Sequence, residues 1–142
     1  MAATVSYADV RPGTELEPRS YQVTRLNLVK YAGASGDFNV IHWNERIAKA
    51  VGLPDVIAHG MFTMAQAGRY VSEWAGDLGA VVEFGVRFSA AVVVPDDDKG
   101  ATIEISGTVK DKLDGNKVVL ALVARSGDEK VLTRARAVVV LP

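Results

Sequence analysis

The period of hydrophobic and polar positions changes along the chain, and each period predicts a different kind of element. Apolar and polar residues alternate from Ser20 to Thr24, which predicts a half-buried strand. Residues 25–31 have helical spacing, and Gly33 and Gly36 then release the chain into a turn. The chain is therefore expected to begin with one strand and one short helix.

Two further helices are predicted in the middle of the chain. Asn44 can cap a helix that runs to about Val51, where Gly52 ends it. Residues 61–74 form the longest helical segment, and their apolar side chains leave only a narrow polar strip. Such a helix is expected to be largely buried, and Gly76 is expected to end it.

Beyond Gly79 the period falls to two, which predicts strands joined by tight turns. In the first of these strands, the alternating apolar residues from Val82 to Phe88 are expected to share one buried face. Asp114-Gly115 is a strong hairpin signal. The predicted strands are residues 82–88, 102–110, 118–123 and 131–140.

These elements predict an α+β protein: one strand, a long helix and a four-strand antiparallel meander. A single antiparallel sheet wrapped around a long central helix is the hotdog fold. The chain has 142 residues, of which 49% are hydrophobic, and it has no internal repeat or linker. We therefore predict one domain that spans residues 1–142.

Composition excludes several classes of function. The formal net charge is -1 and no basic block occurs, which argues against nucleic acid as a partner. The absence of cysteine excludes disulfides and thiolate sites, and two histidines argue against a dedicated metal site. The chain has neither a recognisable signal peptide nor an apolar stretch of membrane-spanning length, so a cytoplasmic location without membrane insertion is expected.

Candidate chemistry is concentrated between Tyr31 and His42. Asp37 and His42 stand five residues apart across a glycine-rich turn, so one group can accept a proton while the other donates one. Asn39 can fix that turn by bonding nearby backbone. Taken alone, the same residues also fit an ordinary turn followed by a half-buried histidine.

Two segments resemble the MaoC-like hydratase family. Ser35-Gly36-Asp37-Phe38-Asn39-Val40-Ile41-His42, followed by Ala48, resembles its hydratase 2 motif, and Ile57-Ala58-His59-Gly60-Met61 resembles the block that opens its central helix. The resemblance covers nearly the whole chain and is strongest to the B subunits of mycolic-acid-type (3R)-hydroxyacyl-ACP dehydratases. Val40 stands where the family has proline, so the turn lacks the rigidity of a fixed φ.

The resemblance implies a hydro-lyase of fatty-acid metabolism that needs no cofactor or metal. Such an enzyme interconverts (3R)-hydroxyacyl and trans-2-enoyl thioesters of acyl carrier protein or coenzyme A. In the dehydration direction His42 would take the α-proton and Asp37 would protonate the leaving hydroxyl, with Asn39 in a supporting role. The backbone N–H of Gly60, at the start of the central helix, would stabilise the enolate oxygen. His59 is expected to hold the start of that helix by packing and local bonding, and Ser35 to be a turn or capping residue.

Other functions remain open at this point. A noncatalytic acyl-binding hotdog subunit of a heterodimeric dehydratase, or a thioesterase, would use the same fold. The presence of Asp37, Asn39 and His42 together favours catalysis, because a supporting subunit needs no acid–base pair. A homodimer, or a heterodimer with a second hotdog subunit, is expected because pairing would cover an open sheet edge.

Overall fold

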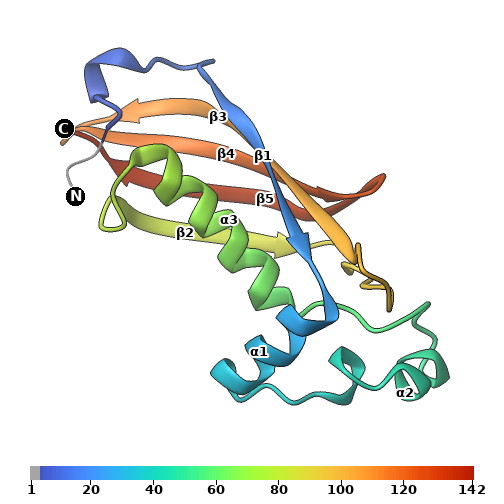
Figure 1. The fold of residues 1–142 in the computed structure, drawn as a ribbon. Coiled ribbons are helices and arrows are strands. Elements are labelled where there is room, and N and C mark those ends of the chain that lie inside the picture. The colour runs from blue at the N-terminus through green and yellow to red at the C-terminus, as the bar shows by residue number, and fades with distance from the viewer. Residues whose placement is uncertain (1–3) are drawn as a thin grey trace.

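The computed structural model describes residues 4–142, which fold around the long helix α3 (Gly60–Ala75). The buried side chains of α3 recur at helical spacing. The helix lies against one face of a curved sheet (Figure 1). Gly76 ends the helix in the left-handed conformation, with φ of 76°. The predicted helix and its end are confirmed. Burial is confined to one face, however, because Met61 and Ala65 are exposed on the other.

Five antiparallel strands form the sheet, in the order β1-β3-β4-β5-β2. They are β1 (Glu15–Val23), β2 (Val81–Phe88), β3 (Ala101–Leu113), β4 (Lys117–Ser126) and β5 (Glu129–Val140). The α+β architecture and the hotdog arrangement of sheet and helix are confirmed. β1 and β2 are the two edge strands.

The predicted four-strand meander is wrong, because β2 pairs with β5 and not with β3. Only β3, β4 and β5 follow one another as hairpins. Residues 89–100 carry the chain from the β2 edge toward β3, and they form an isolated bridge between Val93 and Ile57 on the way. A connection of this length allows the next strand to join the sheet elsewhere, so β3 lies beside β1.

The expected buried face of β2 is only partly formed. The pairing register with β5 shifts between Val81 and Glu83 and again between Gly85 and Arg87. The first shift places an extra residue, Val82, on β2 and breaks the alternation of inward and outward side chains there, whereas the second places the extra residue on β5. Val82 is exposed at this bulge, and Phe88 is half-exposed where its ring lines a cavity.

The N-terminal strand is longer than predicted, because β1 begins at Glu15 and not at Ser20. Its register shifts between Leu16 and Arg19, where Pro18 lies. Proline donates no backbone hydrogen bond, which restricts it to edge strands and bulges of this kind. Thr24 lies outside the strand.

Three helical segments lie between β1 and α3. They are α1 (Arg25–Ser35), the 3₁₀ turn η2 (Val40–His42) and α2 (Glu45–Ala50). The predicted cap of α2 is confirmed, since Asn44 Oδ1 accepts a hydrogen bond of 3.1 Å from Ile47 N–H. α1 runs past Gly33 to Ser35. A further 3₁₀ turn, η1 (Tyr7–Asp9), precedes β1.

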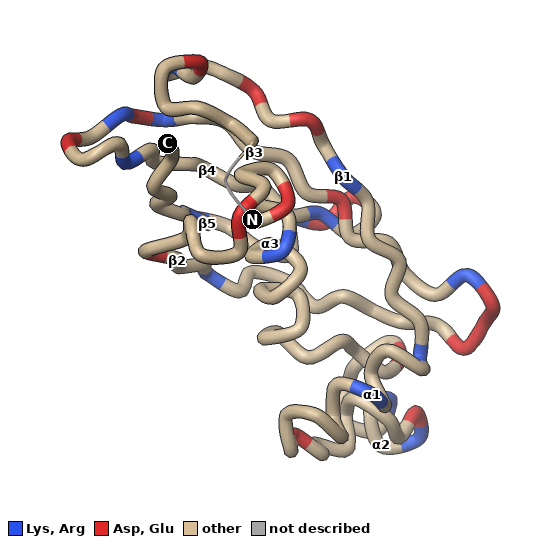
Figure 2. The backbone as a smooth tube through the Cα atoms, turned by 60° about the vertical axis from the view of Figure 1, so that its left-hand side comes forward, with Lys and Arg blue, Asp and Glu red and all other residues tan. Residues whose placement is uncertain are grey.

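Charged residues of both signs are interspersed over the fold (Figure 2). The acidic segment Asp96–Asp98 is exposed, as expected for a solvated loop, and Asp97 Oδ1 accepts a hydrogen bond of 2.9 Å from Lys99 N–H. Within residues 4–142, no helix combines the length and the hydrophobicity needed to span a membrane.

Candidate active site

The end of α1 positions Asp37. Gly36 adopts a left-handed conformation, with φ of 76°, and turns the chain out of the helix. Ser35 Oγ–H donates to the carbonyl oxygen of Tyr31 at 2.7 Å and accepts from Asp37 N–H at 3.1 Å. Ser35, the last residue of α1, thus bonds at the end of the helix, in line with the predicted turn or capping role, and it fixes the backbone from which the Asp37 carboxylate projects.

Asn39 holds the next part of the turn. Its N–H donates to Asp37 Oδ1 at 3.2 Å, and its own Oδ1 accepts from Ile41 N–H at 3.3 Å. The predicted bonding of Asn39 to nearby backbone is confirmed. These bonds restrain the segment around Val40, at which η2 begins, without the proline ring that is usual in the family motif.

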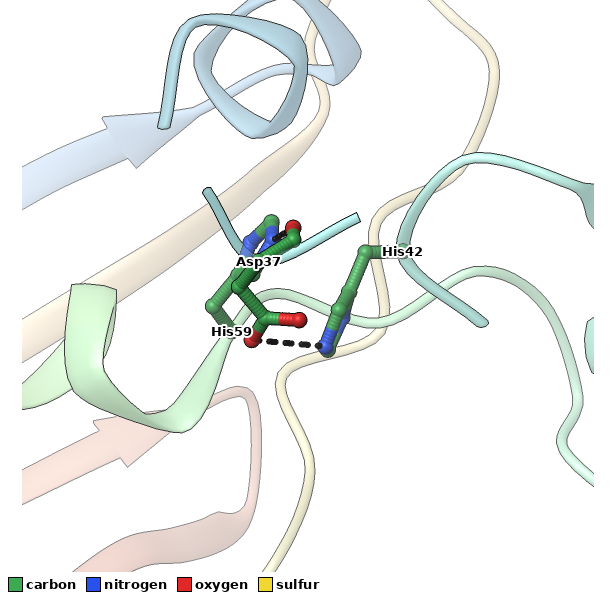
Figure 3. Close-up of side chains that lie close together, drawn as sticks. All are labelled: Asp37, His42 and His59. Atoms are coloured by element: carbon green, nitrogen blue, oxygen red, sulfur yellow. Dashed lines mark hydrogen bonds and ion pairs between the residues drawn. The ribbon is translucent and has the colours of Figure 1, made fainter. Parts of the chain in front are cut away.

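His42 lies at the end of η2 and faces Asp37 (Figure 3). Its Nδ1 lies 2.6 Å from the carbonyl oxygen of Ile57, which can only accept, so the proton of the neutral ring is on Nδ1. The lone pair is then on Nε2, which lies 4.0 Å from Asp37 Oδ2. The turn therefore presents a basic nitrogen and a carboxylate oxygen to the same small space.

The environment of His42 favours its neutral form. Burial lowers the pKa of His42 below its ordinary value, and nearby His59 acts in the same direction. The hydrogen bond to Ile57 and the negative charge of Asp37 oppose that shift. Asp37, in contrast, has a half-exposed side chain, with an exposed fraction of 51%. The pair thus combines a buried imidazole that favours its neutral form with an accessible carboxyl group.

His59 joins the same group, which the sequence interpretation did not anticipate. Its ring stacks on that of His42, with centroids 3.8 Å apart and planes at 24°. Its Nε2–H donates to the Asp37 carbonyl oxygen at 3.0 Å (Figure 3). The expected packing of His59 is confirmed, since only 1% of the residue is exposed, but the expected local bond is wrong, because its side chain makes no cap hydrogen bond. A signal was present: the two histidines of the chain each fall in one of the two motif segments.

Gly60 stands where a cavity of about 340 Å³ meets the first turn of α3. N–H groups in a first helical turn have no intrahelical acceptor, so they are free to bind an oxygen in the cavity. A Cβ atom at this position would lie 3.2 Å from the Phe88 ring, so glycine leaves space between the helix start and the wall. The wall also includes His42, Thr63, Val92 and Leu132. Asp37 lies outside this wall, beside His42.

Asp37, His42 and His59 each offer one atom that could bind a metal ion, and these atoms all lie within 4.8 Å of one another. The lone pair of an imidazole lies in the plane of its ring. Because the two rings are stacked and nearly parallel, their lone pairs do not converge on one point as a chelate requires. The geometry fits proton transfer better than metal binding.

Comparison with known proteins identifies the family of this chain. Residues 8–127 match the MaoC like domain. The chain belongs to the MaoC-like dehydratase family. This MaoC-like chain is 39% identical over 74 residues to 3-hydroxyacyl-thioester dehydratase X of Mycobacterium tuberculosis, a match that covers 52% of the chain and 25% of that relative.

Solved structures show the same fold over nearly the whole MaoC-like chain. A structure described as a MaoC-like dehydratase superposes with a TM-score of 0.95 at 40% identity, covering 99% of this chain and 43% of that one. The ChsH1-ChsH2 complex from Mycobacterium tuberculosis gives a TM-score of 0.81 at 23% identity, covering 93% of this chain and 98% of the matched one. The chain thus spans a quarter of the length of the matched dehydratase X and less than half of the first structure.

Proposed function

We propose that this domain catalyses the reversible dehydration of (3R)-hydroxyacyl thioesters to trans-2-enoyl thioesters, as a hydro-lyase of fatty-acid metabolism. The observation that carries the proposal is the opposition of His42 Nε2 and Asp37 Oδ2 across 4.0 Å, beside the cavity at the start of α3. Membership of the MaoC-like family supports the reaction class. The (3R) configuration follows from the resemblance of residues 35–42 to the hydratase 2 motif.

The proposed dehydration needs one base and one acid. The Nε2 lone pair of His42 takes a proton from the α-carbon, and that C–H electron pair forms the new α,β double bond. As the bond from the β-carbon to its hydroxyl breaks, protonated Asp37 gives its proton to the departing oxygen, which leaves as water. Transfer of the proton from His42 back to Asp37 restores the site. Hydration follows the same steps in reverse.

Negative charge develops on the thioester carbonyl oxygen as the α-proton leaves. Backbone N–H groups at the start of a helix stabilise such charge, because they are unpaired and the helix dipole is positive there. Gly60 occupies this position in α3 and lines the cavity. We therefore assign its N–H the role of oxyanion donor.

A direct assay tests the reaction class. The purified chain would be mixed with crotonyl thioesters of coenzyme A and of acyl carrier protein, and loss of the enoyl absorbance would be followed. Chiral chromatography would identify the product. Formation of the (3R)-hydroxy product is expected. Release of free thiol without hydration would instead indicate a thioesterase, and a (3S) product would contradict the assignment.

The pH dependence of kcat/KM for dehydration of a (3R)-hydroxyacyl thioester should report the neutral base. Because burial lowers the pKa of His42, the acid limb of the profile is expected below the ordinary histidine value of about 6.5. Activity should fall only as the pH drops through that lowered pKa, where His42 becomes protonated and can no longer accept the α-proton. Initial rates across an acidic buffer series provide the measurement. An acid limb above the ordinary value would contradict a buried neutral base.

We also propose that the working unit contains a second hotdog module. β2 is an edge strand, with Val82 and Phe88 exposed on it, and unpaired edges of this kind favour association. The first structural match extends well beyond the single module that this chain aligns to, and another match comes from a complex of two named components. A partner at this edge would lie close to Phe88, which lines the cavity.

Size-exclusion chromatography with light scattering checks the pairing. At micromolar concentration the chain is expected to be a homodimer, or to form a heterodimer when a second hotdog subunit is added. We expect the homodimer to act on short acyl chains and the heterodimer on longer ones, because the partner would extend the acyl channel. A fully active monomer would contradict the pairing. If the chain binds acyl thioesters but shows no turnover, the alternative function, a noncatalytic acyl-binding subunit of a heterodimeric dehydratase, is favoured.

A further inference from the structure

His59 is a buried titratable group that the proposed acid–base steps leave unused. Only 1% of the residue is exposed. Its ring contacts His42 on one side and lies 4.8 Å, between centroids, from the tilted ring of Tyr31. Within residues 4–142, its Nδ1 is the one buried side-chain nitrogen or oxygen without a hydrogen-bond partner.

Packing alone does not account for an imidazole at this position. An apolar ring would fill the same space without leaving a buried nitrogen unsatisfied, and unsatisfied groups of this kind are unfavourable. The imidazole differs from such a ring in two ways that bear on the site. It donates a hydrogen bond from Nε2 to the Asp37 carbonyl oxygen, and it can carry charge next to His42.

We propose that His59 is a positioning residue for the Asp37–His42 pair. The inference rests on the proposed hydratase function. One face of the His59 ring fixes the plane of the His42 imidazole, and its Nε2–H fixes the main chain that carries the Asp37 carboxylate. One side chain thereby sets the distance between the base and the acid.

The position of His59 in the chain also links the Asp37–His42 pair to the start of α3. It is the N-cap residue of α3, so its backbone moves with the helix start that presents the Gly60 N–H. The same residue therefore links three segments: the Asp37 turn, η2 with His42, and α3. Small errors in the placement of the base and the acid slow the reaction strongly, since a misplacement of about 1 Å can lower a rate by about 100-fold.

Two variants separate the contributions of His59. His59→Phe keeps a ring against His42 but removes the donor to Asp37. His59→Gln keeps an amide donor near the place of Nε2 but removes the ring. Each is expected to lower kcat by about 10- to 100-fold with little change in KM, because the groups that bind substrate are intact.

NMR titration of the His42 ring supplies a readout that does not depend on activity. Ring currents from position 59 should shift the His42 C–H resonance in the wild type and in His59→Phe, and that shift should be lost in His59→Gln. Both variants should raise the pKa of His42, because His59 lowers it in the wild type alongside burial, the largest cause. Asp37 is the other titratable group that acts on His42, and it is unchanged in both variants.

Tyr70→Phe is the matched control. Tyr70 is also 1% exposed, and its hydroxyl donates to a backbone carbonyl, that of Glu17, at 3.1 Å. Loss of that bond should lower stability without changing the titration of His42. If the His59 variants lose kcat only to the extent that Tyr70→Phe does, with an unchanged His42 pKa in both variants and an unchanged His42 resonance in His59→Gln, the positioning role is overturned. Wild-type kcat in both variants also overturns it. An inactive wild type would contradict the proposed function, whereas the titration would still test the contact between the rings.

Discussion

Replacement of His42 by glutamine is expected to lower kcat by about 10²- to 10⁴-fold, the usual contribution of a general base. Glutamine retains a polar side chain of similar reach but has no lone pair that accepts a proton at neutral pH. Asp37→Asn should cause a loss of similar size, because the amide cannot protonate the leaving hydroxyl. Steady-state hydration of a short 2-enoyl thioester gives both values, and circular dichroism checks the fold.

Asp77→Asn is a suitable control for the aspartate variant. Asp77 Oδ1 accepts a hydrogen bond of 2.9 Å from Gly79 N–H, much as Asp37 Oδ1 accepts from Asn39 N–H. The control therefore removes an equivalent turn carboxylate away from the cavity, and its kcat should equal that of the wild type. Near-normal rates in both His42→Gln and Asp37→Asn would show that the site has been assigned wrongly.

Replacement of Gly60 by proline should lower kcat by about 10²- to 10³-fold, the usual effect of losing one oxyanion donor. Proline lacks an N–H but is well tolerated at the first position of a helix, which Gly60 occupies. The preceding residue, His59, has φ of -58° and ψ of 133°, the extended conformation that a residue before proline prefers. The substitution thus removes the donor while leaving the helix start compatible with the fold.

Gly60→Ala separates loss of the N–H from crowding. Alanine adds the Cβ that would lie 3.2 Å from the Phe88 ring but keeps the N–H. Phe88 is exposed and can move by a few tenths of an ångström, so this control should retain most of the activity. If the alanine and proline variants lose the same fraction of kcat, the N–H has no special role and the loss comes from contact with Phe88.

Local signals in the sequence were sufficient to predict most helices and strands. Asn44 marks the start of α2, Gly76 marks the end of α3, and Asp114-Gly115 marks the hairpin between β3 and β4, as the structure confirms. Each depends on the conformational preference of a few neighbouring residues, which a single sequence records. The family resemblance of residues 35–42 also identified the segment in which Asp37 and His42 face each other.

Contacts between residues far apart in the chain could not be predicted from such local signals. The pairing of β2 with β5 depends on the path of residues 89–100, whose pattern does not reveal where the next strand joins the sheet. The exposure of Val82 follows from an irregular register that only the partner strand reveals. The stacking of His59 on His42 arises from two segments that meet only in the folded chain. Such features are set by tertiary contacts and leave little trace in local sequence.

The sheet order has a consequence for how the protein folds. Strands β3, β4 and β5 are consecutive and can form as local hairpins, but β1 must find β3 across residues 24–100. Closure of a loop of this length carries an entropic penalty before any contact stabilises it, and it slows folding. Asp37, His42 and His59 all lie within that loop. During synthesis, therefore, the segment that carries these three residues is expected to be fixed in place late, after the C-terminal hairpins have left the ribosome.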